Sequence, residues 1–317
     1  MRWTVGIASR LAGVLLAATV VGACGKDAGR TDNSARESVA DLTSPSAVSA
    51  ALHYVAFGDS WPEGAHCGRC RTFADLWATR IRSATGKEID FTDYTGSRER
   101  SAARVKASAS LLEALRTDDV TRAAVQSAEV LLIATGPNEL EQILDPLHNG
   151  RCGGSDGFDC IRDLGSVWRK NFDAILTEID KLRAGLPTAV RIVSAANLFV
   201  SDPAIGQGLP KDFATTGGAL LYKLLTEAVC EAAVKHHAVC IDVRPILNGP
   251  TLVHPVDENS PASMQAVADA LAAAGLPELG IQKLPKSGVH ALRAPRDDLV
   301  LSCVSWPCRL TSRRESS

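Results

Sequence analysis

The chain has 317 residues, a formal net charge of −2 and nine cysteines. The near balance of charge, without a basic stripe or basic residues interleaved with aromatic ones, excludes the usual nucleic-acid-binding proteins, so we expect no nucleic acid partner. The residues that follow position 50 are enough for one large domain.

The first 23 residues have the pattern of a secretory signal peptide. Arg2 and Arg10 give a charged start, and the apolar run over 11–21 is too short to cross a bilayer as a helix. Cys24 directly follows small residues, which resembles a bacterial lipobox, where the cysteine carries a diacylglycerol. The alternative is an ordinary signal peptide cut near Ala23. We therefore expect an exported protein, either anchored to the outer face of the cell membrane as a lipoprotein or secreted.

Residues 24–50 are predicted to be a flexible tether. They are rich in Ser, Ala, Asp, Arg and Gly and have almost no large apolar side chains, so they cannot bury a core. From residue 51 to about 280 the pattern changes to one folded domain, in which apolar runs alternate with segments of helical period.

Five nearly continuous apolar runs predict strands that are covered on both faces. They span 54–57, 89–93, 130–134, 190–195 and 239–243. Helices are predicted between and after them, over 73–85, 102–115, 161–183, 218–235 and 261–274. The alternation indicates the α/β class, with a doubly wound, flavodoxin-like parallel sheet of about five strands flanked by helices.

Eight cysteines remain when Cys24 is set aside, and they fall into four pairs of close neighbours. An even number in an exported chain predicts disulfides. Pairing neighbours gives Cys67–Cys70, Cys152–Cys160, Cys230–Cys240 and Cys303–Cys308. A zinc ribbon would need a second CxxC motif, so we expect no metal. The last pair staples a predicted C-terminal extension over 281–317.

Three predicted strands end in residues that suit acyl transfer. Gly58-Asp59-Ser60-Trp61 follows the first strand, Thr95-Gly96-Ser97 the second and Thr135-Gly136-Pro137-Asn138 the third. Ligands of open α/β sheets bind at such carboxyl ends. Ser60 would attack an ester carbonyl, and three donors would form the oxyanion hole: the backbone N–H groups of Ser60 and Gly96 and the amide of Asn138. Taken singly, Ser60 and Asn138 are also suited to cap helices, and Gly96 to a turn.

Together these motifs resemble the SGNH (GDSL-type) hydrolases. Members of that family have a GDS nucleophile motif after the first strand, a glycine after the second and a GxN motif after the third. The resemblance covers roughly residues 54–275. It implies a serine esterase or lipase that needs no cofactor and cleaves carboxylic esters through an acyl-Ser60 intermediate. It also implies that Asp59 orders the loop and is not the acid of a triad.

The general base is where this chain departs from the family. The family uses a histidine in a DxxH motif just before the last helix. His254 lies on the loop ahead of the helix predicted at 261–274, with Thr251 in place of the aspartate. His290 follows that helix in the sequence Ser-Gly-Val-His. A surface histidine is the alternative interpretation of either.

We predict that His254 is the base, with His290 as the alternative. The loop that carries His254 ends at the same sheet edge as Ser60, whereas His290 reaches that edge only if the tail folds back. A backbone carbonyl, Asp257 or Glu258 would then orient the imidazole.

The substrate is expected to be a small-molecule, lipid or acylated-carbohydrate ester, with Trp61 on the acyl-binding wall. We expect a monomer, held at the membrane by the lipid on Cys24. Two other functions stay open. One is a catalytically inactive binding or scaffold lipoprotein with the same fold, which the missing DxxH motif favours. The other is an acyltransferase that uses the same site.

Overall fold

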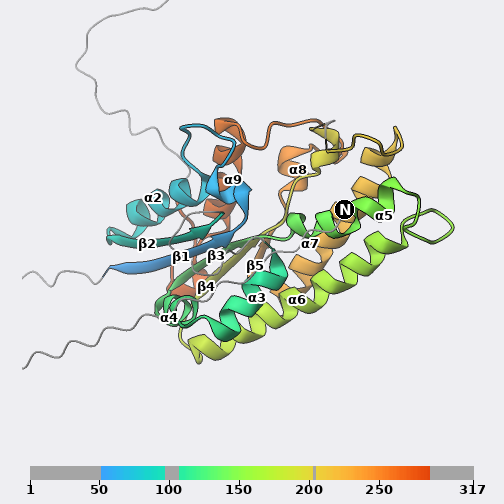
Figure 1. Ribbon diagram of the computed structural model, residues 1–317. Helices are drawn as coiled ribbons and strands as arrows, with labels where there is room; N and C mark the ends of the chain where they lie inside the picture. The colour runs from blue at the N-terminus through green and yellow to red at the C-terminus, as the bar shows by residue number, and fades with distance from the viewer. Residues whose placement is uncertain (1–50, 97–106, 203–204, 286–317) are drawn as a thin grey trace, which may run out of the picture. The chain divides into compact units, whose positions relative to one another are not determined.

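A five-stranded sheet forms the centre of the described part of the chain (Figure 1). The computed structural model describes residues 51–96, 107–202 and 205–285, all within one compact unit. The strands are β1 (Leu52–Gly58), β2 (Ile89–Thr95), β3 (Val130–Ala134), β4 (Ala189–Val193) and β5 (Val239–Ile241). They are parallel and lie in the order β2-β1-β3-β4-β5. The predicted fold class is therefore confirmed.

Helices cover both faces of this sheet. The α-helices are α1 (Ser60–Glu63), α2 (Phe73–Thr85), α3 (Ser108–Thr117), α4 (Asp119–Ser127), α5 (Glu141–His148), α6 (Asp159–Arg183), α7 (Gly217–Lys235), α8 (Arg244–Leu247) and α9 (Pro261–Ala274). Short 3₁₀ turns are η1 (Pro137–Leu140), η2 (Leu198–Val200), η3 (Phe213–Thr215) and η4 (Pro277–Leu279). Among the described residues, no helix is both long and apolar enough to cross a membrane.

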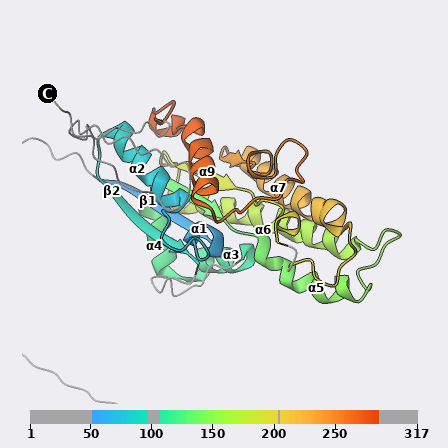
Figure 2. The same cartoon turned by 90° about the horizontal axis from the view of Figure 1, so that it is seen from above.

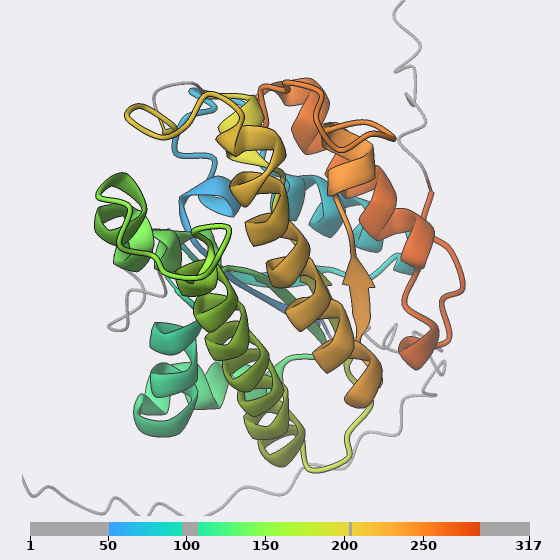
Figure 3. The same cartoon turned by 90° about the vertical axis from the view of Figure 1, so that its right-hand side faces the viewer.

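The alternation of side chains along β1 divides the core into two layers. Val55 and Phe57 face α6, whereas Tyr54 and Ala56 face the layer of α2 and α9. Figure 1 shows α3, α4 and α6 on one side of the sheet and α2 and α9 on the other. From above, α2 and α9 lie side by side (Figure 2), and α6 lies along α7 (Figure 3). A fully buried residue such as Phe172 contributes about 1.5–3 kcal/mol to such a layer.

The strand order places a crevice at the carboxyl ends of β1 and β3. The chain passes from β1 to β2 on one side and then returns to place β3 on the other side of β1. Open α/β sheets bind their ligands at this reversal, because the loops diverge there. The residues after β1 and β3 are those that the sequence proposed for catalysis.

Three of the four predicted disulfides are confirmed. The structure contains Cys67–Cys70, Cys152–Cys160 and Cys230–Cys240. Disulfides of this kind indicate an oxidising environment. The fourth pair, Cys303–Cys308, lies outside the described residues, as do Cys24, His290 and most of the predicted extension.

Candidate active site

Ser60 lies at the carboxyl end of β1 and is exposed. Asp59 caps the short helix α1, and its Oδ1 accepts from the Trp61 N–H at 3.0 Å. The Asp59 N–H donates to the Ala134 carbonyl at 3.2 Å, which ties this loop to the end of β3. A side chain at position 58 would lie 2.6 Å from the same carbonyl, so only glycine allows this approach. Ser60 itself is not the cap.

The loop after α1 turns back onto Ser60. The Ala65 N–H donates to the Ser60 carbonyl at 3.0 Å, and the next residue, His66, is exposed. The Cys67–Cys70 disulfide closes the following turn. His66 is therefore held near the start of α1. Sequence reasoning did not select it, although its place six residues after Ser60 and directly before the Cys67–Cys70 pair was a usable signal.

Ser60 opens into a cavity of about 630 Å³. Two other segments supply most of the wall, the loop around η2 and the loop before α9. The lining residues are Ser60, His66, Leu198, Ser201, Asp202, Ile205, Pro255, Val256, Asp257, Glu258 and Asn259. A cavity of this size accommodates a small-molecule ligand.

Gly96 does not offer its backbone donor in this structure. It has a φ of 63°, a left-handed conformation that suits glycine. Its N–H donates to the Gly58 carbonyl at 2.9 Å, which continues the ladder between β1 and β2. In this structure the N–H is therefore engaged in strand pairing, and the role of Gly96 as an oxyanion donor stays a prediction. Strand pairing, which the sequence pattern did not resolve at this residue, takes the donor.

Asn138 is half-buried in η1, directly after the carboxyl end of β3. It is not a helix cap, since Gly136 precedes η1 and Leu140 precedes α5 in the capping positions. The adjacent Glu139 is buried and fixes η1, because its Oε1 accepts from the Ser108 N–H at 2.6 Å and from the Ser108 hydroxyl. Burial raises the pKa of Glu139. Asn138 thus stands on a well-anchored turn.

Two carboxyl groups near Ser60 share an unusual environment. Burial raises the pKa of Asp59 from 3.8 to about 7, opposed by the hydrogen bond from Trp61 and assisted by the charge of Glu139. Burial, together with the charges of Asp59 and Asp257, raises the pKa of Glu258 from 4.5 to about 8. Perturbed groups in a cleft are typical of functional sites.

Trp61 belongs to the core of the domain. Only 8% of its surface is exposed, and its ring packs on Phe73 with centroids 5.0 Å apart. Its Nε1 donates to the Glu258 carbonyl at 3.1 Å. The sequence assigned Trp61 to the wall of an acyl pocket, but it is not among the lining residues of the Ser60 cavity. It fastens the loop before α9 to α1.

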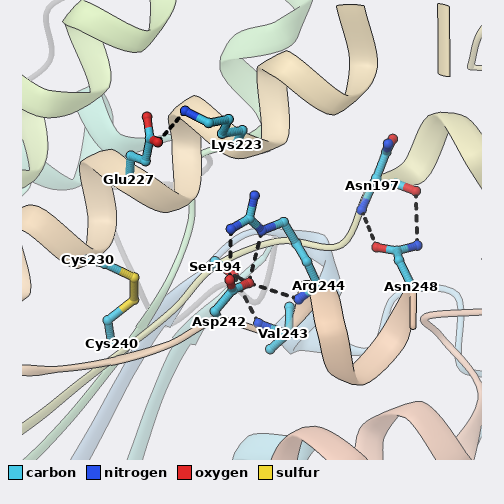
Figure 4. A network of polar contacts seen from close by, with 10 residues as sticks. All are labelled: Ser194, Asn197, Lys223, Glu227, Cys230, Cys240, Asp242, Val243, Arg244 and Asn248. Atoms are coloured by element: carbon cyan, nitrogen blue, oxygen red, sulfur yellow. Dashed lines mark hydrogen bonds and ion pairs between the residues drawn. A yellow bond between two sulfur atoms is a disulfide. The ribbon is translucent and has the colours of Figure 1, made fainter. Parts of the chain in front are cut away.

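A polar network holds the loop between β5 and α9 at the sheet edge (Figure 4). The Arg244 guanidinium donates to both carboxylate oxygens of Asp242, at 3.0 and 2.8 Å. Further along, Asn248 Oδ1 accepts from the Asn197 N–H at 2.7 Å. The Asn248 amide donates to the His254 carbonyl at 3.1 Å. The course of the loop towards Ser60 is therefore fixed by hydrogen bonds.

His254 is exposed at the start of the cavity-lining segment. Its N–H donates to the Asn248 carbonyl at 2.9 Å. Its ring lies against Gly249, where a Cβ atom would come within 2.5 Å of His254 Cδ2. The lining of the Ser60 cavity begins with the next residue, Pro255. The structure thus brings Ser60 together with the segment that follows His254, and the role of His254 as the base stays a prediction.

Three solved structures show what this chain is similar to. A lipase from a goat rumen metagenome has a TM-score of 0.53 and 20% identity, over 71% of this chain and 98% of the lipase. An extracellular lipase from Streptomyces rimosus has a TM-score of 0.44 and 15% identity, over 72% and 98%. A carbohydrate acetylesterase from Sinorhizobium meliloti has a TM-score of 0.37 and 15% identity, over 70% and 99%.

No protein-family model matches the sequence, and no curated protein does either. The likeness to the rumen lipase shows a shared fold.

Proposed function

We propose that this chain, with its SGNH-hydrolase fold, is a hydrolase of carboxylic esters in which Ser60 is the nucleophile. The observation that carries the proposal is the position of Ser60. Its side chain is exposed at the carboxyl end of β1, at the reversal of strand order, and it opens into a cavity of about 630 Å³. An acyl-transfer nucleophile needs this combination of rigid support and access.

The reaction begins with attack of Ser60 Oγ on the ester carbonyl, as a base removes the hydroxyl proton. The carbonyl oxygen becomes an oxyanion, which the Ser60 N–H and the Asn138 amide stabilise. Collapse breaks the bond to the alcohol and leaves an acyl-Ser60 intermediate. Water then releases the carboxylic acid. The base comes from the loop before α9, where the sequence proposes His254.

The test is labelling with a fluorophosphonate probe together with turnover of p-nitrophenyl acetate. We expect Ser60→Ala to lose both labelling and turnover, by several orders of magnitude, while the fold is retained. The matched control is Ser83→Ala, which removes an exposed hydroxyl from α2 and is expected to change neither. A wild-type protein that never labels would instead support the inactive binding lipoprotein.

Export and lipid anchoring form a separate part of the proposal. The three disulfides fit an oxidising compartment, and the sequence around Cys24 supports a lipid anchor. In a bacterial host, Cys24→Ser is expected to move the protein from the membrane fraction to the soluble fraction without loss of specific activity. Wild-type protein that is already soluble after signal cleavage contradicts the anchor.

A further inference from the structure

Three segments of the chain surround the cavity at Ser60. Helix α1 and the loop after it contribute Ser60 and His66. The other two segments form an η2 wall, made of Leu198, Ser201, Asp202 and Ile205, and an α9 wall, made of residues 255–259. These segments are far apart in the sequence, so the width of the cavity depends on the contacts that join them.

The indole of Trp61 joins the α9 wall to α1. Its Nε1 donates to the Glu258 carbonyl at 3.1 Å, across 197 positions of the sequence. The indole is buried against Phe73, and the backbone N–H of Trp61 donates to Asp59 Oδ1 at 3.0 Å. Because the indole is held in the core, its N–H fixes the backbone of the α9 wall relative to the residue next to Ser60.

The hydroxyl of Ser201 joins the α9 wall to the η2 wall. Ser201 Oγ accepts from the Val256 N–H at 3.0 Å, across 55 positions of the sequence. The Ser201 N–H donates to the Leu198 carbonyl at 3.0 Å, which anchors the η2 wall to η2. The Asp257 carbonyl accepts from Ser263 Oγ at 2.7 Å, which anchors the α9 wall to α9. Each wall is therefore attached to its own helical turn, and a hydrogen bond connects the two walls.

Both walls contribute apolar side chains to the cavity. Leu198 and Ile205 belong to the η2 wall, and Pro255 and Val256 belong to the α9 wall. Small-molecule sites bind the apolar part of a ligand through side chains of this kind. An acyl group on Ser60 therefore has its apolar partners on the two walls that the hydrogen bonds hold. A group too wide for the space between the walls has to displace one of them, which breaks a hydrogen bond.

We propose that Trp61 and Ser201 determine the substrate specificity of this site, which selects esters of small, unbranched carboxylic acids. The two side chains do this by fixing the positions of the walls. Trp61 is a positioning residue, because it acts through the Glu258 backbone from outside the cavity, whereas Ser201 lines the cavity itself. The inference rests on the proposed ester hydrolysis at Ser60 and names the class of ester.

The size of the effect follows from the strength of one hydrogen bond. A typical hydrogen bond within a protein changes an equilibrium by about 2–10-fold. An enzyme discriminates between two substrates by the ratio of their kcat/KM values. Each bond therefore lowers kcat/KM for a wide ester by about this factor, relative to kcat/KM for a small ester. In a variant that lacks the bond, the ratio of wide to small should rise by the same factor.

The experiment compares p-nitrophenyl pivalate, whose acyl group is branched, with p-nitrophenyl acetate in the full-length protein. Comparing the ratio of their kcat/KM values between variants removes the difference in intrinsic reactivity of the two esters. We expect Trp61→Phe, which keeps an aromatic ring and removes the N–H, to raise the pivalate-to-acetate ratio about 2–10-fold. Ser201→Ala should raise the ratio by a similar factor, because the Val256 N–H loses its acceptor.

Two matched controls separate these bonds from general destabilisation. Trp77 on α2 is buried in the same core layer as Trp61, and among the described residues its Nε1 has no hydrogen-bond partner. Trp77→Phe removes the same atoms without breaking a bond, so the ratio should stay at the wild-type value. Ser83→Ala is the control for Ser201→Ala, since the Ser83 hydroxyl donates within α2 and does not line the cavity. A purely structural role would lower Tm and leave the ratio unchanged.

The results that overturn this inference differ from those that overturn the proposed function. If folded Trp61→Phe and Ser201→Ala proteins both keep the wild-type ratio, the walls do not limit the acyl group, and Ser60 remains the nucleophile. A Trp61→Phe protein that does not fold leaves the Ser201→Ala ratio to decide. If Trp77→Phe raises the ratio as much as Trp61→Phe, the cause is core packing and not the bond to Glu258. If Ser60→Ala retains turnover of both esters, the proposed function fails, and this inference fails with it.

Discussion

Two sites in this domain place charged side chains away from water, and they differ in how the charges are compensated. Arg191 on β4 is fully buried, and its guanidinium donates to both oxygens of Glu278 at 2.9 Å and to the Gly275 carbonyl at 2.6 Å. At the other place, burial and neighbouring negative charges raise the pKa values of Asp59 and Glu258, and within the described residues neither carboxyl forms an ion pair with a cation. The fold neutralises the first charge and leaves the second pair uncompensated.

The difference separates a structural arrangement from a functional one. A paired charge joins β4 to the segment after α9 and has no reason to change protonation. Uncompensated acids make folding less favourable whenever they ionise, and groups of this kind persist where protons move. Burial is the main cause of the raised pKa values of Asp59 and Glu258, and both lie around the proposed nucleophile, Asp59 next to Ser60 in sequence and Glu258 in the lining of the same cavity.

The largest expected effect comes from breaking the compensated pair. Glu278→Ala leaves Arg191 buried without its carboxylate, which should lower the free energy of unfolding by about 3–5 kcal/mol. Urea denaturation measures this, and kcat/KM of the folded fraction should stay the same. The control is Glu88→Ala, which breaks an exposed pair with Arg82 and should cost at most about 1 kcal/mol. Equal losses in both variants would contradict the structural role of Glu278.

The second prediction concerns Asn138 and the reaction proposed at Ser60. Asn138→Ala removes the amide that we propose stabilises the oxyanion, so kcat should fall about 10²–10³-fold, or roughly 2.7–4 kcal/mol of transition-state stabilisation, with little change in KM. Stopped-flow or steady-state turnover of p-nitrophenyl acetate measures the two constants. An effect on KM alone would show that Asn138 binds substrate and does not stabilise the transition state.

Much of the fold was predictable because its signals are local. The predicted bounds of α2 and α9 agree with the structure, and both helices carry side-chain caps, Thr72 and Ser260. The helix expected at 102–115 is observed from Ser108 to Thr117. Helix α4 was missed, because it spans only nine residues and buries only Thr121 and Val125.

The site was predictable only where it depends on strand ends. Ser60 and Asn138 follow β1 and β3 directly, so the parallel sheet determines their positions. The hydrogen bond from the Trp61 Nε1 to the Glu258 carbonyl holds the loop before α9 beside α1. These two residues are 197 positions apart in the sequence, so no local pattern reveals their contact. The pairing of the Gly96 N–H with β1 likewise joins residues that are far apart in sequence, and a local pattern does not reveal it.

The smallest effect tests whether the uncompensated acids make folding less favourable. Asp59 has a pKa of about 7 in the folded protein and an ordinary value of 3.8. Between these pH values the folded state binds more protons than the unfolded state, so stability falls as pH rises, and above pH 7 the full penalty is present. The difference between these two pKa values limits the penalty on the free energy of unfolding to about 4 kcal/mol.

Asp59→Asn should therefore stabilise the protein at pH 8, by about 1–3 kcal/mol once relaxation and water access reduce that ceiling. Asparagine still caps α1, because its Oδ1 accepts the Trp61 N–H as well. Urea denaturation at pH 4.5, 6 and 8 should show the gain growing with pH and nearly absent at pH 4.5. The control Asp163→Asn changes an exposed carboxylate of α6 and should show no such trend. A gain that is the same at all three pH values would mean that Asp59 is not protonated in the folded protein, and the contrast with the Arg191–Glu278 pair would then be lost.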